Sequence, residues 1–228
     1  MVQIFTGLMA EGTTDARFLI PIIEKTVKDL VYKEYKGDFE LDIQEIRLKD
    51  TASKYIEKVA NAAKYAEESF GADFIFVHLD ADNKNAREVY QNKINPAKQF
   101  LKDKAMTIGI EACSRIVTIV PITETESWML ADKALFKSQL GTSLSDKELR
   151  INRDVEQMAD PKRVAEEAIK IAFSHKTKKR RRELSISELY QPIGSKIDLS
   201  KLEPLASYQD FKQNIRDVFE ELGYAYYR

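Results

Sequence analysis

The stretch that most constrains the fold runs from Phe74 to Asp82, where an apolar segment ends in two aspartates. Five of its first six residues are apolar, and most of these are β-branched or aromatic. Such a composition is typical of a strand that is buried on both faces, as in the interior of a parallel sheet. Residues two apart on a strand share a face, so we expect Asp80 and Asp82 to point the same way. They would then lie at the carboxyl end of the strand, where open parallel sheets bind their ligands.

The aspartate pair has two interpretations. Two carboxylates that are held close together repel each other unless a cation lies between them, and oxygen ligands favour Mg²⁺ or Mn²⁺. The pair therefore indicates a metal site. In the alternative interpretation, Asp80-Ala81-Asp82-Asn83 is only a polar turn that follows a strand, and this stretch by itself leaves both open.

The order of the remaining patterns predicts an α/β fold. Strand patterns alternate along the chain with amphipathic helical patterns, which indicates a mostly parallel four-stranded sheet flanked by helices. The predicted strands cover residues 2–10, 39–43, 74–79 and 116–120. The second of these alternates apolar and polar residues, which favours a position near the edge of the sheet.

The strand patterns end at Pro121, and the rest of the chain shows helical patterns only. We therefore expect an α/β domain at residues 1–125. A helical C-terminal region, residues 126–228, is expected to pack on it as an appendage. The tryptophan in this region, Trp128, is expected to pack in the core.

Composition excludes several classes of site. A net charge of −1 means that any affinity for nucleic acid must come from local patches. One cysteine, Cys113, and two histidines exclude an internal disulfide framework, a cysteine-based zinc site and a histidine cluster. The lone cysteine fits a reducing compartment, and neither a membrane-spanning run nor a signal-peptide pattern occurs, so we expect a cytoplasmic protein with no membrane partner.

A third carboxylate joins the aspartates in the predicted arrangement. Glu11 follows the first strand, and the carboxyl ends of parallel strands lie on one edge of a sheet. Three carboxylates would suit one or two Mg²⁺ (or Mn²⁺) ions whose coordination is completed by water and phosphate oxygens. A metal held in this way can activate a water and neutralise charge on a phosphodiester.

Two motifs carry a family resemblance. Glu11-Gly12-Thr13-Thr14-Asp15 after the first strand, and an apolar run that ends in His78-x-Asp80-x-Asp82, resemble the Toprim fold. This fold is shared by topoisomerases, bacterial primases and nucleases of the overcoming-lysogenization-defect type. The resemblance covers roughly residues 2–125 and implies a Toprim-like Rossmannoid domain. It also implies that Glu11, Asp80 and Asp82 bind Mg²⁺ for phosphodiester transfer or cleavage.

Later segments extend the resemblance. Residues 121–132 and 192–211 look similar to the DUF4276 group of small bacterial Toprim-like proteins. The chain has no topoisomerase gate and no primase accessory domains, so nuclease chemistry is what the resemblance leaves. Some Toprim-type proteins are encoded beside ATPases in phage-defence systems, which makes an ATPase partner plausible by analogy.

Two further side chains are candidates for the same site. Glu126 is predicted to assist catalysis, because it follows the fourth strand within the family-like segment; alternatively, Glu124 and Glu126 only favour the dipole of a helix N-terminus. His78 shares a face with the aspartates and is either a group that supports them, a proton carrier or an ordinary buried histidine.

A basic run provides the candidate contact to nucleic acid. Six of its seven residues carry a positive charge, enough to contact several phosphates, although such a run is often only a solvated surface. The predicted contacts are Lys176, Lys178, Lys179, Arg180, Arg181 and Arg182. Lys84, two residues past the aspartate pair, is a second candidate for a phosphate contact.

The sequence thus predicts a Mg²⁺-dependent nuclease or a related phosphodiester-acting enzyme. The first alternative is a non-catalytic subunit that keeps the fold and binds nucleic acid or a protein partner. The second is a phosphatase of the haloacid-dehalogenase type, which is disfavoured because its Asp-x-Asp normally follows the first strand. DNA or RNA as substrate, the oligomeric state, the general base and the biological trigger stay open.

Overall fold

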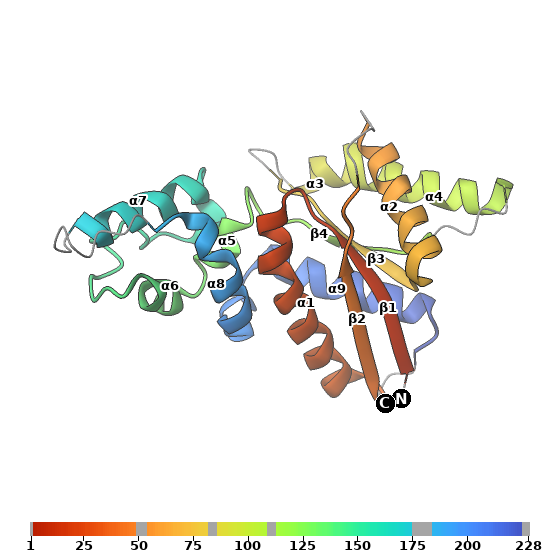
Figure 1. The fold of residues 1–228 in the computed structure, drawn as a ribbon, viewed down its shortest axis with the longest axis horizontal. Coiled ribbons are helices and arrows are strands. Elements are labelled where there is room, and N and C mark those ends of the chain that lie inside the picture. The colour runs from red at the N-terminus through yellow and green to blue at the C-terminus, as the bar shows by residue number, and fades with distance from the viewer. Residues whose placement is uncertain (1, 49–53, 82–85, 109–112, 175–183, 225–228) are drawn as a thin grey trace.

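The computed structural model describes residues 2–48, 54–81, 86–108, 113–174 and 184–224 (Figure 1). Three of the residues or segments singled out from the sequence lie outside the described residues: Asp82, Lys84 and the basic run 176–182. Within the described ranges, no helix combines the length and the apolar composition that a membrane span requires.

The sheet has four strands, all parallel, in the order β2-β1-β3-β4, which confirms the predicted fold class. The strands are β1 (Val2–Met9), β2 (Phe39–Glu45), β3 (Phe74–His78) and β4 (Ile116–Ile119). β3 is buried along its whole length in the interior of the sheet. β2, whose residues alternate between exposed and half-buried, lies at the edge, as its sequence pattern predicted.

Helices cover both faces of the sheet (Figure 1). One face carries α1 (Thr13–Glu34) and α9 (Ala206–Glu221), and the other carries α2 (Tyr55–Phe70) and α4 (Asn95–Ile108). The short helix α3 (Ala86–Val89) and a π-helical turn, η1 (Tyr90–Ile94), lead into α4.

Alternate side chains of β3 point to opposite faces of the sheet and pack against the helices there. Phe74 and Phe76 contact Phe219 and Phe211 of α9, with ring centroids 6.1 and 6.2 Å apart. Val77, on the opposite side of the strand, packs near Val59 of α2. This two-sided burial is why the β3 segment is apolar at successive positions.

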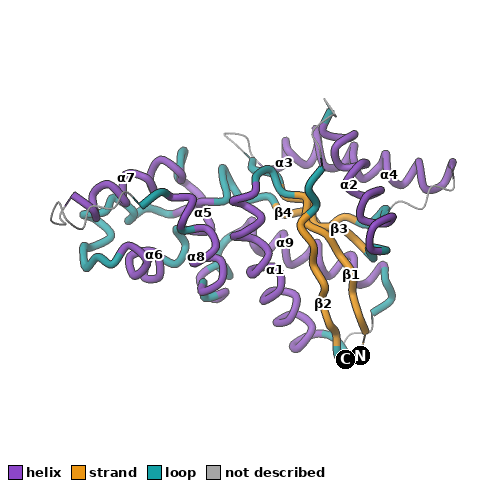
Figure 2. The backbone as a smooth tube through the Cα atoms, in the orientation of Figure 1, coloured by secondary structure: helices purple, strands orange, loops and turns teal. Residues whose placement is uncertain are grey.

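The chain after residue 125 is helical, as predicted. Its first helices form a lobe beside the sheet (Figure 2): α5 (Glu126–Met129), α6 (Lys133–Leu140), α7 (Pro161–Ser174) and α8 (Tyr190–Lys196). Short 3₁₀ turns lie at Val155–Gln157, Ile186–Glu188 and Leu199–Lys201. We call α5 to α8, with their connections, the helical lobe; α9 leaves it and returns to the sheet.

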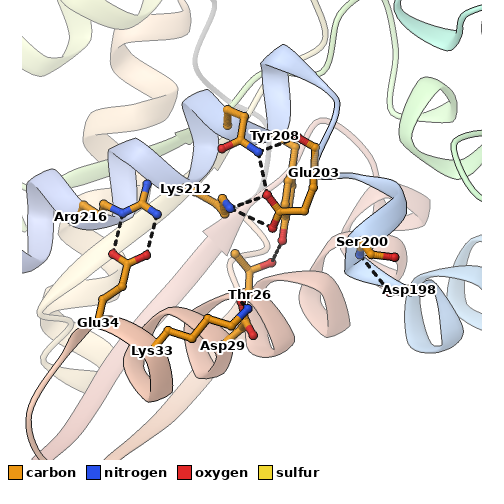
Figure 3. Close-up of polar contacts among 11 residues, drawn as sticks. Thr26, Asp29, Lys33, Glu34, Asp198, Ser200, Glu203, Tyr208, Lys212 and Arg216 are labelled. Atoms are coloured by element: carbon orange, nitrogen blue, oxygen red, sulfur yellow. Dashed lines mark hydrogen bonds and ion pairs between the residues drawn. The ribbon is translucent and has the colours of Figure 1, made fainter.

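Polar contacts fix α9 against α1 (Figure 3). The two guanidinium contacts from Arg216 to the carboxylate of Glu34 are both 2.7 Å long, and the hydroxyls of Thr26 and Tyr208 are 2.9 Å apart. The indole N–H of Trp128, a fully buried residue of α5, donates to Ser207 Oγ at 2.8 Å. These contacts tie α1, the helical lobe and the last helix together.

The helical lobe is also packed closely on α1 through α8. A Cβ atom at Gly194 would lie 2.3 Å from the carbonyl oxygen of Phe18, so only glycine fits there. Lys25 of α1 donates to the carbonyl oxygens of Gly194 and Ile197, at 3.0 and 2.8 Å, and so satisfies two acceptors at the end of α8. The packing of α8 on α1 also brings Tyr190, the first residue of α8, into contact with the ring of Phe18 near the start of α1.

Candidate functional site

Three loops at one edge of the sheet carry the candidate site. Met9 is paired with Val77, and His78 is paired with Ile119, so β1, β3 and β4 end at nearly the same level. The chain that follows each strand therefore emerges at one edge. These loops and the start of α1 supply Glu11, Asp15, Asp80 and Thr125.

The structure brings Glu11 and Asp80 together. The backbone N–H of Asp80 donates to Oε2 of Glu11 at 3.1 Å, although 69 positions separate the two residues. Two of the three residues predicted as metal ligands thus lie next to each other, at the ends of adjacent strands, through a contact from the Asp80 backbone to the Glu11 carboxylate. The third, Asp82, lies outside the described residues.

His78 and Thr125 hold one oxygen of Asp80. Oδ1 accepts from the backbone N–H of Thr125 at 3.0 Å and from its hydroxyl at 3.2 Å. The Nε2 atom of His78 lies 3.2 Å from the same oxygen and 3.0 Å from the Thr125 hydroxyl. Because a carboxylate only accepts hydrogen bonds, a hydrogen bond between His78 and Asp80 requires a proton on Nε2. His78 is buried and contacts Asp80 from inside the fold. Residues that hydrogen-bond to a metal-binding side chain commonly orient it in this way.

Asp15 is a member of the site that the sequence analysis named only as part of a motif and gave no role. It lies in the first turn of α1, where an acidic residue also favours the helix dipole. Burial raises its pKa most, and the nearby charge of Asp80 raises it further, while His78 and a polar contact with Thr125 oppose the rise. Its position four residues after Glu11, across the turn into α1, was the available signal in the sequence.

The charges at this edge are coupled. Burial acts to lower the pKa of His78, but the carboxylates of Asp80, Asp15 and Glu11 outweigh it, and the pKa is raised. The site thus concentrates negative charge around a buried imidazole. Such an arrangement favours an added cation, which removes the repulsion between the carboxylates.

Glu126 has a different environment from the other acidic side chains. Its carboxylate is buried and accepts a hydrogen bond from the hydroxyl of Tyr190. The ammonium of Lys162, whose side chain is 51% exposed, lies 3.8 Å from Oε1. Burial raises the pKa of Glu126, and the hydrogen bond from Tyr190 opposes the rise. Glu126 therefore joins the edge of the sheet to α7 and α8.

Tyr190 is a second residue that sequence reasoning missed. Burial raises its pKa most, and the charges of Glu126, Asp15 and Asp80 add to the rise. The phenol thus lies within electrostatic reach of both the strand-end carboxylates and Glu126. Sequence offered no signal for it, because 64 positions separate Tyr190 from Glu126.

The donor atoms at this edge are of the type that a hard divalent cation prefers. Glu11, Asp15 and Asp80 supply carboxylate oxygens only, which suit Mg²⁺ and Mn²⁺. Among the residues that the structure describes, no three His, Cys, Asp or Glu side chains are grouped closely enough to hold a metal ion by themselves. The set that the sequence predicts includes Asp82, which is outside that part of the chain.

The Toprim resemblance therefore rests on the motifs around Glu11 and Asp80. The structure itself shows an α/β fold with a parallel four-stranded sheet. No protein-family model, no curated protein and no solved structure matches the chain.

Proposed function

We propose that this protein is a Mg²⁺-dependent enzyme that acts on phosphodiesters, as a Toprim-type nuclease does. The observation that carries this proposal is the approach of Glu11 to Asp80, from the ends of adjacent parallel strands, with 3.1 Å between the Asp80 nitrogen and Oε2 of Glu11. Asp15 adds a third carboxylate to the same edge. Oxygen ligands at the carboxyl ends of parallel strands form an arrangement that suits metal-assisted phosphate chemistry.

Each residue has a defined part in this proposal. Glu11, Asp80 and Asp82 would hold Mg²⁺ or Mn²⁺, with Asp15 beside them. The bound ion supplies positive charge to the phosphodiester and lowers the pKa of a water. His78 and Thr125 orient Asp80 through Oδ1. We assign the ligand role to the other oxygen, Oδ2, because the contacts that His78 and Thr125 make with the Asp80 side chain are made through Oδ1.

The helical lobe would supply the contacts to nucleic acid. Lys162 places an exposed ammonium beside Glu126, at the border between the lobe and the strand ends, where it can meet a phosphate oxygen. The run 176–182, which follows α7 in the sequence, stays the predicted contact to the backbone of a longer substrate. An ATPase partner and a role in phage defence stay analogies from the family resemblance.

Cleavage assays test the proposal directly. Plasmid DNA and single-stranded DNA and RNA would be incubated with wild type, Glu11→Gln and Asp80→Asn in the presence of Mg²⁺ or Mn²⁺. Both substitutions keep side-chain size and remove one charge, so we expect metal-dependent cleavage to fall by about a hundredfold or more. Asp42→Asn, at an exposed position on the edge strand β2, is the matched control and should cleave as wild type does.

Two results would contradict the proposal. Cleavage that survives in Asp80→Asn would place the chemistry elsewhere. A wild-type protein that binds nucleic acid but cleaves none of the substrates with either metal would favour the non-catalytic binding subunit. Unfolding midpoints of each variant exclude the trivial explanation that the protein has lost its fold.

A further inference from the structure

The loop between β4 and α5 contains an unusual turn. Thr123 has a φ of 70°, and Arg150 is the only other non-glycine residue with a positive φ in the described part of the chain. The N–H of Glu124 donates to the carbonyl oxygen of Ile122 at 3.0 Å, which closes the backbone around Thr123. A positive φ with a hydrogen bond two residues back is the pattern of the strained form of the γ-turn.

A β-branched residue is a poor choice for this conformation. Its branched side chain crowds the backbone at positive φ, and such a conformation persists only where the surrounding structure enforces it. Two contacts with the helical lobe do so. The Thr123 hydroxyl donates to the carbonyl oxygen of Met158 at 3.2 Å, and the carboxylate of Glu124 accepts from the backbone N–H of Lys162 at 3.1 Å.

The turn places Thr125 next to Asp80. Two residues after Thr123, the N–H and the hydroxyl of Thr125 both donate to Oδ1 of Asp80. Thr125 is fully buried, so its side chain is held in place. The direction of its N–H and hydroxyl groups therefore depends on the course of the backbone that precedes it. The direction of that backbone is set at Thr123.

We propose that Thr123 is a positioning residue, through which the helical lobe sets the aim of Thr125 at Asp80. The lobe holds the strained turn at Met158 and Lys162, the turn fixes Thr125, and Thr125 occupies Oδ1 of Asp80. The role of Oδ2 as a metal ligand rests on the proposed function, whereas the link from Thr123 to Asp80 does not. A displacement at the start of α7 would therefore reach the predicted metal site through this turn.

Amide hydrogen exchange, measured by NMR without metal, tests the link. Thr123→Gly removes the hydroxyl that donates to the carbonyl oxygen of Met158, and with it one of the two contacts that hold the turn on the helical lobe, so we expect the Thr125 amide to exchange about tenfold faster. Amides of β3 should be unchanged, because the substitution relieves strain. Thr123→Ser keeps the hydroxyl and should restore the protection. Arg150→Gly, at the other positive-φ position, is the matched control and should leave Thr125 as in wild type.

Calorimetric titration with Mn²⁺ alone gives a second readout on the same proteins. We expect Thr123→Gly to bind Mn²⁺ several-fold more weakly than wild type, with Thr123→Ser close to wild type. If wild type binds no Mn²⁺, the proposed function fails, while the exchange data still decide the link. Protection of Thr125 that stays within twofold of wild type in Thr123→Gly, or that falls equally in β3, would overturn the inference.

Discussion

A close backbone contact between the helical lobe and α1 gives the sharpest stability prediction. Gly194 of α8 lies against Phe18 of α1, and replacing it by alanine adds one methyl group at that contact. The new carbon would lie 2.3 Å from the carbonyl oxygen of Phe18 and 2.9 Å from its Cα. Both partners are backbone atoms within helices, so neither can turn away as a flexible side chain would.

The magnitude follows from these distances. Non-bonded heavy atoms pack at about 3.5 Å or more, so α8 must move by about 1 Å. Overpacking of this kind costs about 1–3 kcal/mol, and the rigid contact argues for the upper end. Alanine favours a helix over glycine by about 1 kcal/mol, which leaves a net loss of about 2 kcal/mol. For a chain of this length that corresponds to a fall of about 4–8 °C in Tm.

Urea and thermal unfolding provide the assay. The single tryptophan, Trp128, is fully buried between α5 and α9, so its emission reports loss of the packing between lobe and sheet. Ser195→Ala is the matched control, because Ser195 is the next residue of α8 and is exposed. Its Tm should stay at the wild-type value, within about 1 °C.

A Gly194→Ala protein with the Tm of Ser195→Ala would refute the reasoning. It would mean that α8 can shift on α1 without loss of packing. The contact of Tyr190 with Glu126 would then not be fixed by this interface.

Three further predictions concern other parts of the fold. Arg216→Gln removes both 2.7 Å contacts to Glu34 and should lower the free energy of unfolding by about 1 kcal/mol. The control is Lys33→Gln, which breaks an exposed ion pair with Asp29 and should leave the urea midpoint unchanged. Hydrogen bonds from Arg216 hold the pKa of Glu34 below its usual range, so this stabilisation is present above the ordinary Glu pKa of about 4.3 and is lost as the pH falls through the lowered pKa. Urea titrations at pH 7 and at pH 3 should therefore show the gap between wild type and Arg216→Gln closing at the lower pH, and a constant gap would contradict this. Burial raises the pKa of Cys113 to about 11, so its thiol should react with an aromatic disulfide at pH 8 more than about a hundredfold slower than in urea-unfolded protein; equal rates would show that the site is open.

The sheet was predictable because its strands carry local patterns. Successive apolar residues in β3 reflect burial on two faces, and the alternation in β2 reflects an edge position with one exposed face. The fully buried Trp128 also agrees with its predicted place in the core. Periodicity is a local property of the chain, and these features depend on it alone.

The surroundings of the site were not predictable in the same way. An amphipathic stripe shows that one face of a helix is buried but not what covers it, so α9 could not be assigned to the sheet from Phe211 and Phe219. The contact of Thr125 with Asp80 joins residues 45 positions apart. In the sequence, Asp15 was only the last residue of the motif that begins at Glu11, because its approach to Asp80 arises when β1 and β3 pair.

The return of α9 to the sheet has a consequence for the order in which the protein folds. Phe74 and Phe76 are covered by Phe219 and Phe211, which a ribosome adds more than a hundred residues later. At about 5–20 residues per second, the nascent sheet keeps an uncovered aromatic face for several seconds or more. Contacts so distant in sequence also slow folding, because a long loop must close before they form. A fragment of residues 1–125 should therefore need a chaperone, or α9 supplied as a separate peptide, to stay in solution.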